Sequence, residues 1–143
     1  MSSVLTEGGP LPGEIVDGKY EVISVLGRGG MGVVVSANHL VLHEKVAIKT
    51  LVASLASDAL SIERFLREAR ALAKIQSSHV ARVLDVTSLS NGSPCIVMEY
   101  LEGEDLDSLV EREGRIPFGR AVDYVLEACE AIAEAHALEI IHR

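Results

Sequence analysis

The sequence predicts an α+β fold, in which an antiparallel sheet of five strands carries one helix and is followed by further helices. Three observations support this fold class. Residues 19–51 are rich in β-branched side chains with two turn-like interruptions, which indicates three strands. Residues 57–75 place apolar side chains at i, i+3 and i+4, which indicates an amphipathic helix. Two more strand-like runs and two helical runs follow, between residues 81 and 137.

The composition narrows the function classes. The 143 residues fit one domain or part of a larger one, and an apolar content of 48% supports a real core. A net charge of −8 without a basic cluster argues against non-specific binding of nucleic acid. Cys95 and Cys129 form no C-x-x-C pair, and the five histidines lack zinc-ligand spacing. We therefore expect two reduced thiols in a cytoplasmic protein and assign no metal ligand within the chain.

The chain divides into three segments. Residues 1–17 are rich in serine, glycine and proline and are predicted to form a flexible leader, without the features of a secretory signal. Residues 18–103 hold the predicted sheet, and residues 104–143 the last two helices. Since the chain has no run of about 18 apolar residues, no membrane segment is expected in it.

A glycine-rich turn organises the first two strands. Gly27, Gly29 and Gly32 follow the spacing G-x-G-x-x-G between two strand-like runs, residues 20–26 and 33–37. Such a turn forms a flap whose backbone N–H groups can approach phosphates, because no Cβ atoms stand in the way. The alternative is an ordinary hairpin turn. A dinucleotide-binding fold would need a helix directly after Gly32, which the β-branched run does not favour.

One lysine and one glutamate are predicted to face each other. Lys49 lies in an apolar strand-like run that begins at residue 46, where a charge is unusual without a partner. Glu68 lies between Phe65 and Leu72 of the predicted helix, on or beside its apolar stripe. We therefore expect an ion pair between Lys49 and Glu68. The alternative for Glu68 is a solvated position with a basic neighbour on the same helix.

The remaining elements are bounded by recognisable signals. Ser57 or Asp58 is expected to cap the first helix, and Asn91-Gly92 is a hairpin turn signal. Pro117 precedes the last helix. The expected bounds are residues 81–89 and 94–100 for the strands, and 105–113 and 118–137 for the helices.

Together these motifs resemble the protein kinase family, in the style of bacterial serine/threonine kinases of the eukaryotic-like type. The resemblance rests on the G-G-M-G flap, on V-A-I-K ending at Lys49, on F-L-R-E-A around Glu68, and on V-M-E-Y-L-E-G at residues 97–103. It covers nearly everything after residue 17. It implies that residues 18–103 form the kinase small lobe with its hinge, and that residues 104–143 begin the large lobe.

The resemblance implies ATP as cofactor and assigns roles to matching residues. Lys49 would hold the α- and β-phosphates and pair with Glu68. Main-chain groups of Glu99 and Leu101 would bind the adenine edge, and Asp105 the ribose. The full set expected to bind the nucleotide is Leu26, Gly27, Arg28, Gly29, Gly30, Met31, Gly32, Val33, Val34, Ala47, Lys49, Met98, Glu99, Leu101 and Asp105.

Four apolar members of this set would surround the adenine ring. The resemblance implies that Leu26, Val34 and Ala47 sandwich the ring, with Met98 behind it as the gatekeeper. By composition alone, plain core packing is the better interpretation of these side chains. Only the motif framework favours the role in binding.

The last residues set a limit on the expected activity. His142 and Arg143 match the start of H-R-D-x-x-x-x-N, and the aspartate of that motif and the D-F-G aspartate are not in the sequence. The magnesium ligands are thus expected beyond this chain. We expect a fragment that is inactive by itself, from a parent that transfers phosphate from ATP to a protein substrate and that a later segment could anchor to a membrane.

Two other functions remain open at this point. A non-catalytic, pseudokinase-like module for nucleotide binding or scaffolding would share the same motifs. A dinucleotide oxidoreductase is disfavoured, because it needs the helix after Gly32 described above.

Overall fold

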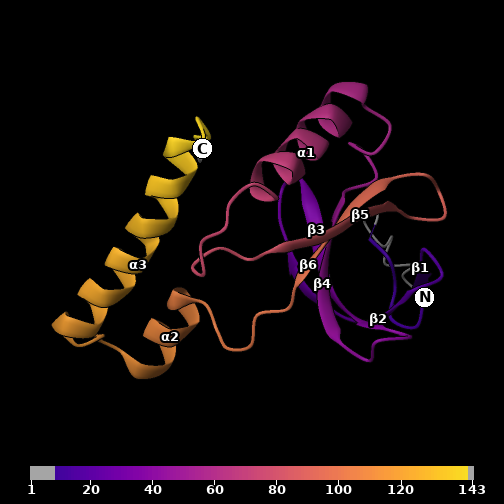
Figure 1. The fold of residues 1–143 in the computed structure, drawn as a ribbon. Coiled ribbons are helices and arrows are strands. Elements are labelled where there is room, and N and C mark those ends of the chain that lie inside the picture. The colour runs from indigo at the N-terminus through magenta and orange to yellow at the C-terminus, as the bar shows by residue number, and fades with distance from the viewer. Residues whose placement is uncertain (1–8, 142–143) are drawn as a thin grey trace. The chain divides into compact units, whose positions relative to one another are not determined.

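The computed structural model describes residues 9–141 (Figure 1). The chain forms two compact units, and neither is continuous in sequence. The first combines the described residues up to Ala73 with Arg82–Tyr100. The second combines Lys74–Ala81 with the described residues from Leu101 onward.

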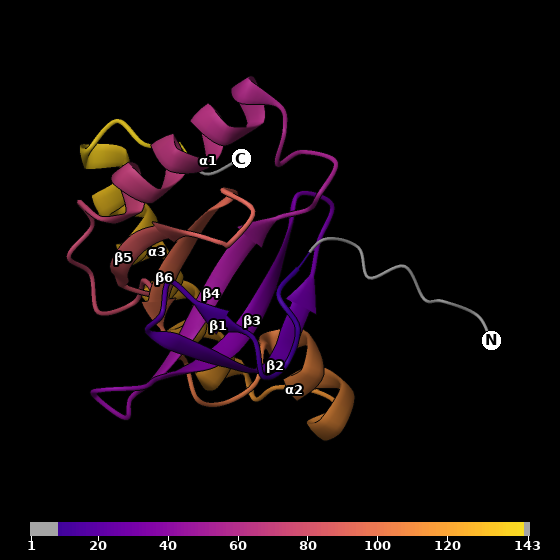
Figure 2. The same ribbon diagram turned by 90° about the vertical axis from the view of Figure 1, so that its right-hand side faces the viewer.

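The first unit is built on a six-stranded antiparallel sheet with the order β1-β2-β3-β4-β6-β5 (Figure 2). The predicted fold class is confirmed, and the five predicted strands are β2 to β6. The sixth strand, β1, is short and pairs with the outer edge of β2. The bounds are β1 Ile15–Val16, β2 Tyr20–Arg28, β3 Gly32–His39, β4 Lys45–Leu51, β5 Val83–Ser88 and β6 Pro94–Glu99.

Strand β1 corrects the predicted extent of the leader. Residues 15 and 16 belong to the sheet, although the segment 1–17 was expected to be a flexible leader. Gly13 donates its N–H to the Val22 carbonyl at 2.8 Å, and Val22 donates to the Glu14 carbonyl at 2.9 Å. The reason is physical: the open edge of β2 carries unpaired backbone groups, and the preceding segment satisfies them.

The sheet buries a separate apolar cluster on each face. Because side chains alternate along a strand, Val33, Val35 and Ile48 lie in one cluster with Val22 and Val97. The other cluster joins the opposite face to the helix, through Leu51, Ile96, Phe65 and Ala69. The strand sequence V-V-V-S-A therefore serves both faces.

Helix α1, Ala59–Leu72, lies along one face of the sheet in both views (Figures 1 and 2). Asp58 caps it, as one of the two predicted caps, by accepting a hydrogen bond from the Ser61 N–H at 2.9 Å. Phe65 and Ala69 are its buried apolar residues. The helix is shorter at both ends than the predicted range of 57–75.

The sheet is strongly curled. Lys19, in the turn between β1 and β2, lies 3.1 Å from Asp17 and 3.9 Å from Asp85 of β5. Strands β2 and β5 are not neighbours in the sheet order, so this contact requires the sheet to bend back toward itself.

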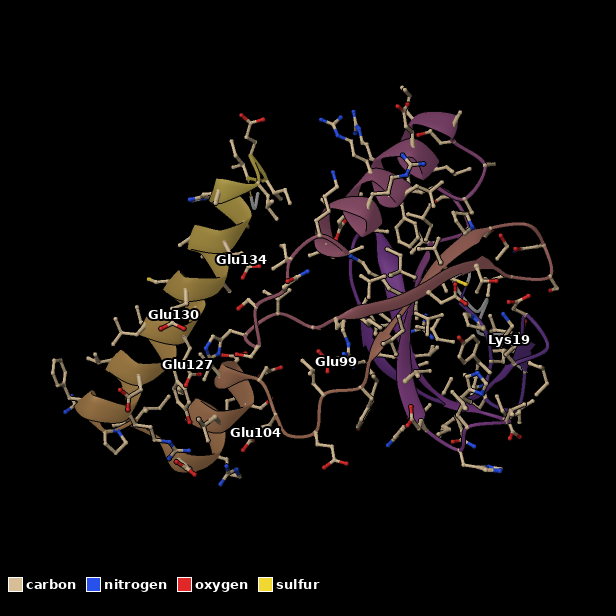
Figure 3. All side chains as sticks on the ribbon, viewed as in Figure 1. Lys19, Glu99, Glu104, Glu127, Glu130 and Glu134 are labelled. Carbon is tan, nitrogen blue, oxygen red and sulfur yellow. The ribbon has the colours of Figure 1, made fainter. Side chains whose placement is uncertain are left out.

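The second unit contains α2, Leu106–Glu113, and α3, Phe118–Ala137. Lys74–Ala81 packs against α3: Gln76 donates its N–H to Glu134 Oε1 at 2.6 Å, and His79 Nε2 lies 3.1 Å from Glu130. Figure 3 shows Glu127, Glu130 and Glu134 along α3. The helix leaves several apolar side chains exposed, including Phe118 at 85%. No described helix is long and apolar enough to cross a membrane.

Candidate nucleotide-binding site

The glycine-rich segment is a tight connection between two strands. β2 ends at Arg28 and β3 begins at Gly32, so the predicted strand–turn–strand arrangement is confirmed. Gly29 donates its N–H to the Gly32 carbonyl at 2.9 Å, which closes the turn. The helix that a dinucleotide-binding fold needs after Gly32 is replaced by a strand.

The glycines of this turn have different roles. A Cβ atom on Gly32 would collide with the Thr50 carbonyl oxygen, because β3 and β4 approach closely there. A Cβ on Gly27 or Gly30 would meet no atom within 4 Å. Gly32 is thus required by packing within the sheet, whereas Gly27 and Gly30 leave open space on the flap.

The glycine-rich flap, residues 27–32, covers a pocket of about 460 Å³. Val34 of β3 and Lys49 of β4, which are direct cross-strand partners, belong to its lining outside the glycine-rich segment. The pocket is lined by Gly27, Arg28, Gly29, Gly30, Met31, Gly32, Val34 and Lys49. Its lining contains cationic side chains and no acidic one, so it is suited to an anionic ligand.

Lys49 and Glu68 form the predicted ion pair. Lys49 Nζ donates to Glu68 Oε1 at 3.0 Å, which confirms that strand and helix turn these side chains toward each other. Their side chains are 30% and 47% exposed, respectively. A pair this accessible contributes little to stability, and its effect is to hold the ammonium in place at the pocket.

The apolar residues expected around adenine fall in different environments. Ala47 of β4 and Met98 of β6 are direct cross-strand partners, on the same face as the Val34–Lys49 pair. Leu26, at 47% exposed, is not among the pocket-lining residues. The Val33 side chain is buried in the core on the other face of the sheet, because it alternates with Val34. Val33 can offer a ligand only its main chain.

The remaining predicted residues have structural partners of their own. Glu99 lies at the end of β6, where Figure 3 labels it. It donates its N–H to the Arg82 carbonyl at 2.9 Å, and its carboxylate accepts from the Arg82 N–H at 2.7 Å. In the second unit, Asp105 caps α2 by accepting from the Ser108 N–H at 2.7 Å. Hydrogen bonds from Ser108 hold the pKa of Asp105 below its usual range. Leu101 is exposed, and His142 and Arg143 lie outside the described residues.

Two features escaped the sequence interpretation. The Lys45 ammonium lies over the Tyr100 ring, 4.1 Å from its centroid. The segment Lys74–Ala81 belongs to the second unit, although the chain on either side of it belongs to the first. The sequence did carry a signal for the second feature. Glu127, Glu130 and Glu134 recur at helical spacing and form the acidic face of α3 that Gln76 and His79 contact.

Across residues 9–141, no group of three His, Cys, Asp or Glu side chains is arranged to hold a metal ion. A magnesium ion held by one or two carboxylates together with nucleotide phosphates would not need such a group.

Comparison with known proteins decides the family. Residues 20–143 match the family described as protein kinase domain. The chain belongs to the protein kinase domain family. It is 37% identical over 131 residues to the serine/threonine-protein kinase pkn3 of Myxococcus xanthus, covering 92% of this chain and 24% of that protein. It is also 37% identical over 126 residues to PknH of Mycobacterium tuberculosis, covering 88% of this chain and 20% of that protein.

Solved structures agree with this assignment. The crystal structure of the kinase domain of PknI from Mycobacterium tuberculosis superposes with a TM-score of 0.74 at 28% sequence identity. The match covers 94% of this chain and 55% of that one. The chain therefore has the kinase fold over about half the length of the solved domain, and it spans less than a quarter of the two curated relatives named above.

Proposed function

We propose that this chain is the ATP-binding part of a serine/threonine protein kinase whose full-length form transfers phosphate from ATP to a protein substrate. The observation that carries the proposal is the Lys49–Glu68 pair at the pocket beneath the flap. A flexible lysine becomes a defined phosphate ligand when a carboxylate fixes its position. The pocket and its lining supply the anion-binding half of such a site.

The proposed binding mode follows from the sheet. The triphosphate lies under the flap, with Lys49 Nζ donating to its oxygens and backbone N–H groups of the turn directed at them. The adenine lies over Ala47 and Met98, on the same face as Val34. Since the Glu99 N–H is bonded to Arg82, Glu99 can offer the adenine edge only its carbonyl.

The chain by itself is proposed to bind nucleotide without transferring its phosphate. Its residues supply the glycine-rich turn and the cationic side chains of Arg28 and Lys49 at the pocket. The 143 residues contain no D-F-G aspartate. A phosphate chain held by one lysine and a few backbone groups, open to water, gains little free energy. We expect millimolar affinity for ATP that changes little when magnesium is added.

Amide NMR titration of the purified chain with ATP tests this binding mode. Lys49→Met removes a charge-assisted hydrogen bond worth about 1.5–3 kcal/mol, so we expect affinity to fall about tenfold or more. Lys74→Met is the matched control, because it removes one lysine outside the pocket. Equal affinities for the wild type and Lys49→Met, or shifts confined to the second unit, would contradict the proposed site.

A further inference from the structure

The row of side chains that leads from Lys49 toward the end of β6 extends beyond the residues predicted for the site. Lys49 pairs with Ile96 and Ala47 with Met98, and the last ladder partners are Val46 and Glu99. Alternation places Lys45 on the same face as Ala47 and Lys49. It places Tyr100 on the same face as Met98. The next cross-strand neighbours are thus Lys45 and Tyr100, directly beyond the Ala47–Met98 pair.

Side chains continue the pairing where the backbone ladder stops. β6 ends at Glu99, so Tyr100 is the first residue past the sheet. Its ring lies under the Lys45 ammonium, 4.1 Å from the centroid, which is cation–π geometry. Among the described residues, the lysine salt bridges involve Lys19 and Lys49 and not Lys45, so the ring is the partner that the structure gives this ammonium.

We propose that Lys45 is a positioning residue for adenine recognition: through the Tyr100 ring it fixes the main chain of residues 99–101. This inference rests on the proposed function, because the adenine edge is placed at that main chain. The Lys45 ammonium itself does not touch the nucleotide. Its loss should therefore weaken binding of adenine nucleotides and leave binding of a bare polyphosphate unchanged.

The size of the effect follows from the contact. An exposed cation–π pair is worth about 0.5–1 kcal/mol, which corresponds to a factor of about 2–5 in affinity. Lys45→Met and Tyr100→Leu should each lower the affinity for ATP by this factor. The double variant should bind ATP no more weakly than either single variant. Lys45→Arg and Tyr100→Phe keep a cation and a ring, so both should retain wild-type affinity.

Two NMR measurements on the purified chain test the inference. The first is titration with ATP and, separately, with inorganic tripolyphosphate, with Lys74→Met as the control for loss of a lysine. The second needs no nucleotide: hydrogen exchange at the Tyr100 and Leu101 amides should quicken in Lys45→Met and not in Lys45→Arg. In the wild type, the Lys45 ε-methylene protons should be shifted upfield by the Tyr100 ring, and Tyr100→Leu should abolish that shift.

The possible results separate this inference from the proposed function. If hydrogen exchange at the Tyr100 and Leu101 amides is unchanged in Lys45→Met, the positioning role is overturned, whatever the affinity of that variant for ATP. An equal loss of affinity for ATP and for tripolyphosphate also overturns it, because the Lys45 ammonium would then act by attracting the phosphates. If exchange quickens as expected but the wild type binds no ATP, the Lys45–Tyr100 contact is established and the proposed function fails, together with the adenine role that depends on it.

Discussion

Gly32 and Gly30 are both glycines of the flap, yet the structure predicts opposite outcomes when each becomes alanine. A Cβ on Gly32 would collide with the Thr50 carbonyl oxygen, which is a main-chain atom of β4 and cannot rotate away. A Cβ on Gly30 would meet nothing within 4 Å. Neither glycine has the positive φ that disfavours other residues, so the comparison isolates packing from backbone strain.

The magnitude follows from what must move. Gly32 pairs with Leu51, so relief of the collision requires β3 to shift away from β4 at the start of their ladder. Overpacking of this kind typically costs about 1–3 kcal/mol. For a unit of fewer than about 100 residues, each kcal/mol lowers Tm by roughly 4–8 °C. We expect Gly32→Ala to lower Tm by about 10 °C and Gly30→Ala by less than about 2 °C.

Thermal unfolding followed by circular dichroism measures the difference, and hydrogen exchange at the β3 and β4 amides locates it in the first unit. Faster exchange there in Gly32→Ala, with the α3 amides unchanged, is the expected result. Equal stability of the two variants would refute the steric argument. A larger loss in Gly30→Ala would mean that the flap, and not the β3–β4 contact, limits the stability of the unit.

Three further predictions concern other parts of the chain. Burial raises the pKa of the Cys95 thiol from 9.0 to about 11. The neutral buried thiol therefore contributes its full stability below pH 9, and this contribution is lost as pH rises toward 11. Over that range, urea unfolding should show the free energy of unfolding of the wild type falling by up to about 3 kcal/mol relative to that of Cys95→Ala. Cys129 is exposed, so a maleimide should label it in the folded chain and leave Cys95 unlabelled until urea is added. Hydrogen bonds from Ser61 hold the pKa of Asp58 below its usual value. Stability from this cap is therefore present above pH 3.8 and falls as the carboxylate is protonated. Amide protection in the first turn of α1, measured relative to the intrinsic exchange rate at each pH, should fall in acid, and Asp58→Ala should show that low protection already at neutral pH.

Much of the fold follows from short-range patterns in the sequence. Alternating β-branched runs located the strands from β2 to β6, and the spacing of Phe65 and Ala69 located α1. The same periodicities turned Lys49 and Glu68 toward each other, which the 3.0 Å contact confirms. These features depend on neighbours within one element, so a single sequence specifies them.

The features that sequence reasoning missed depend on long-range packing. β1 has only two residues, too few for a periodic signal, and forms because the edge of β2 needs partners. The Lys45–Tyr100 contact depends on the pairing of β4 with β6, and no local pattern in the sequence predicts that pairing. Val33 was grouped with the flap by motif, although alternation from Val34 already placed its side chain on the opposite face.

The placement of Lys74–Ala81 in the second unit has a consequence for the order in which the chain folds. Gln76 reaches its partner Glu134 across 58 residues, so a ribosome must extend the chain through most of α3 before that bond can form. Until then, the peptide that follows α1 has no native partner and leads on to the strands that complete the sheet. A chain cut after Tyr100 would keep every strand of the sheet and permanently lack the partners of Gln76 and His79. The second unit therefore cannot be removed cleanly, and a truncation meant to isolate the sheet should also replace residues 74–81 with a short polar linker.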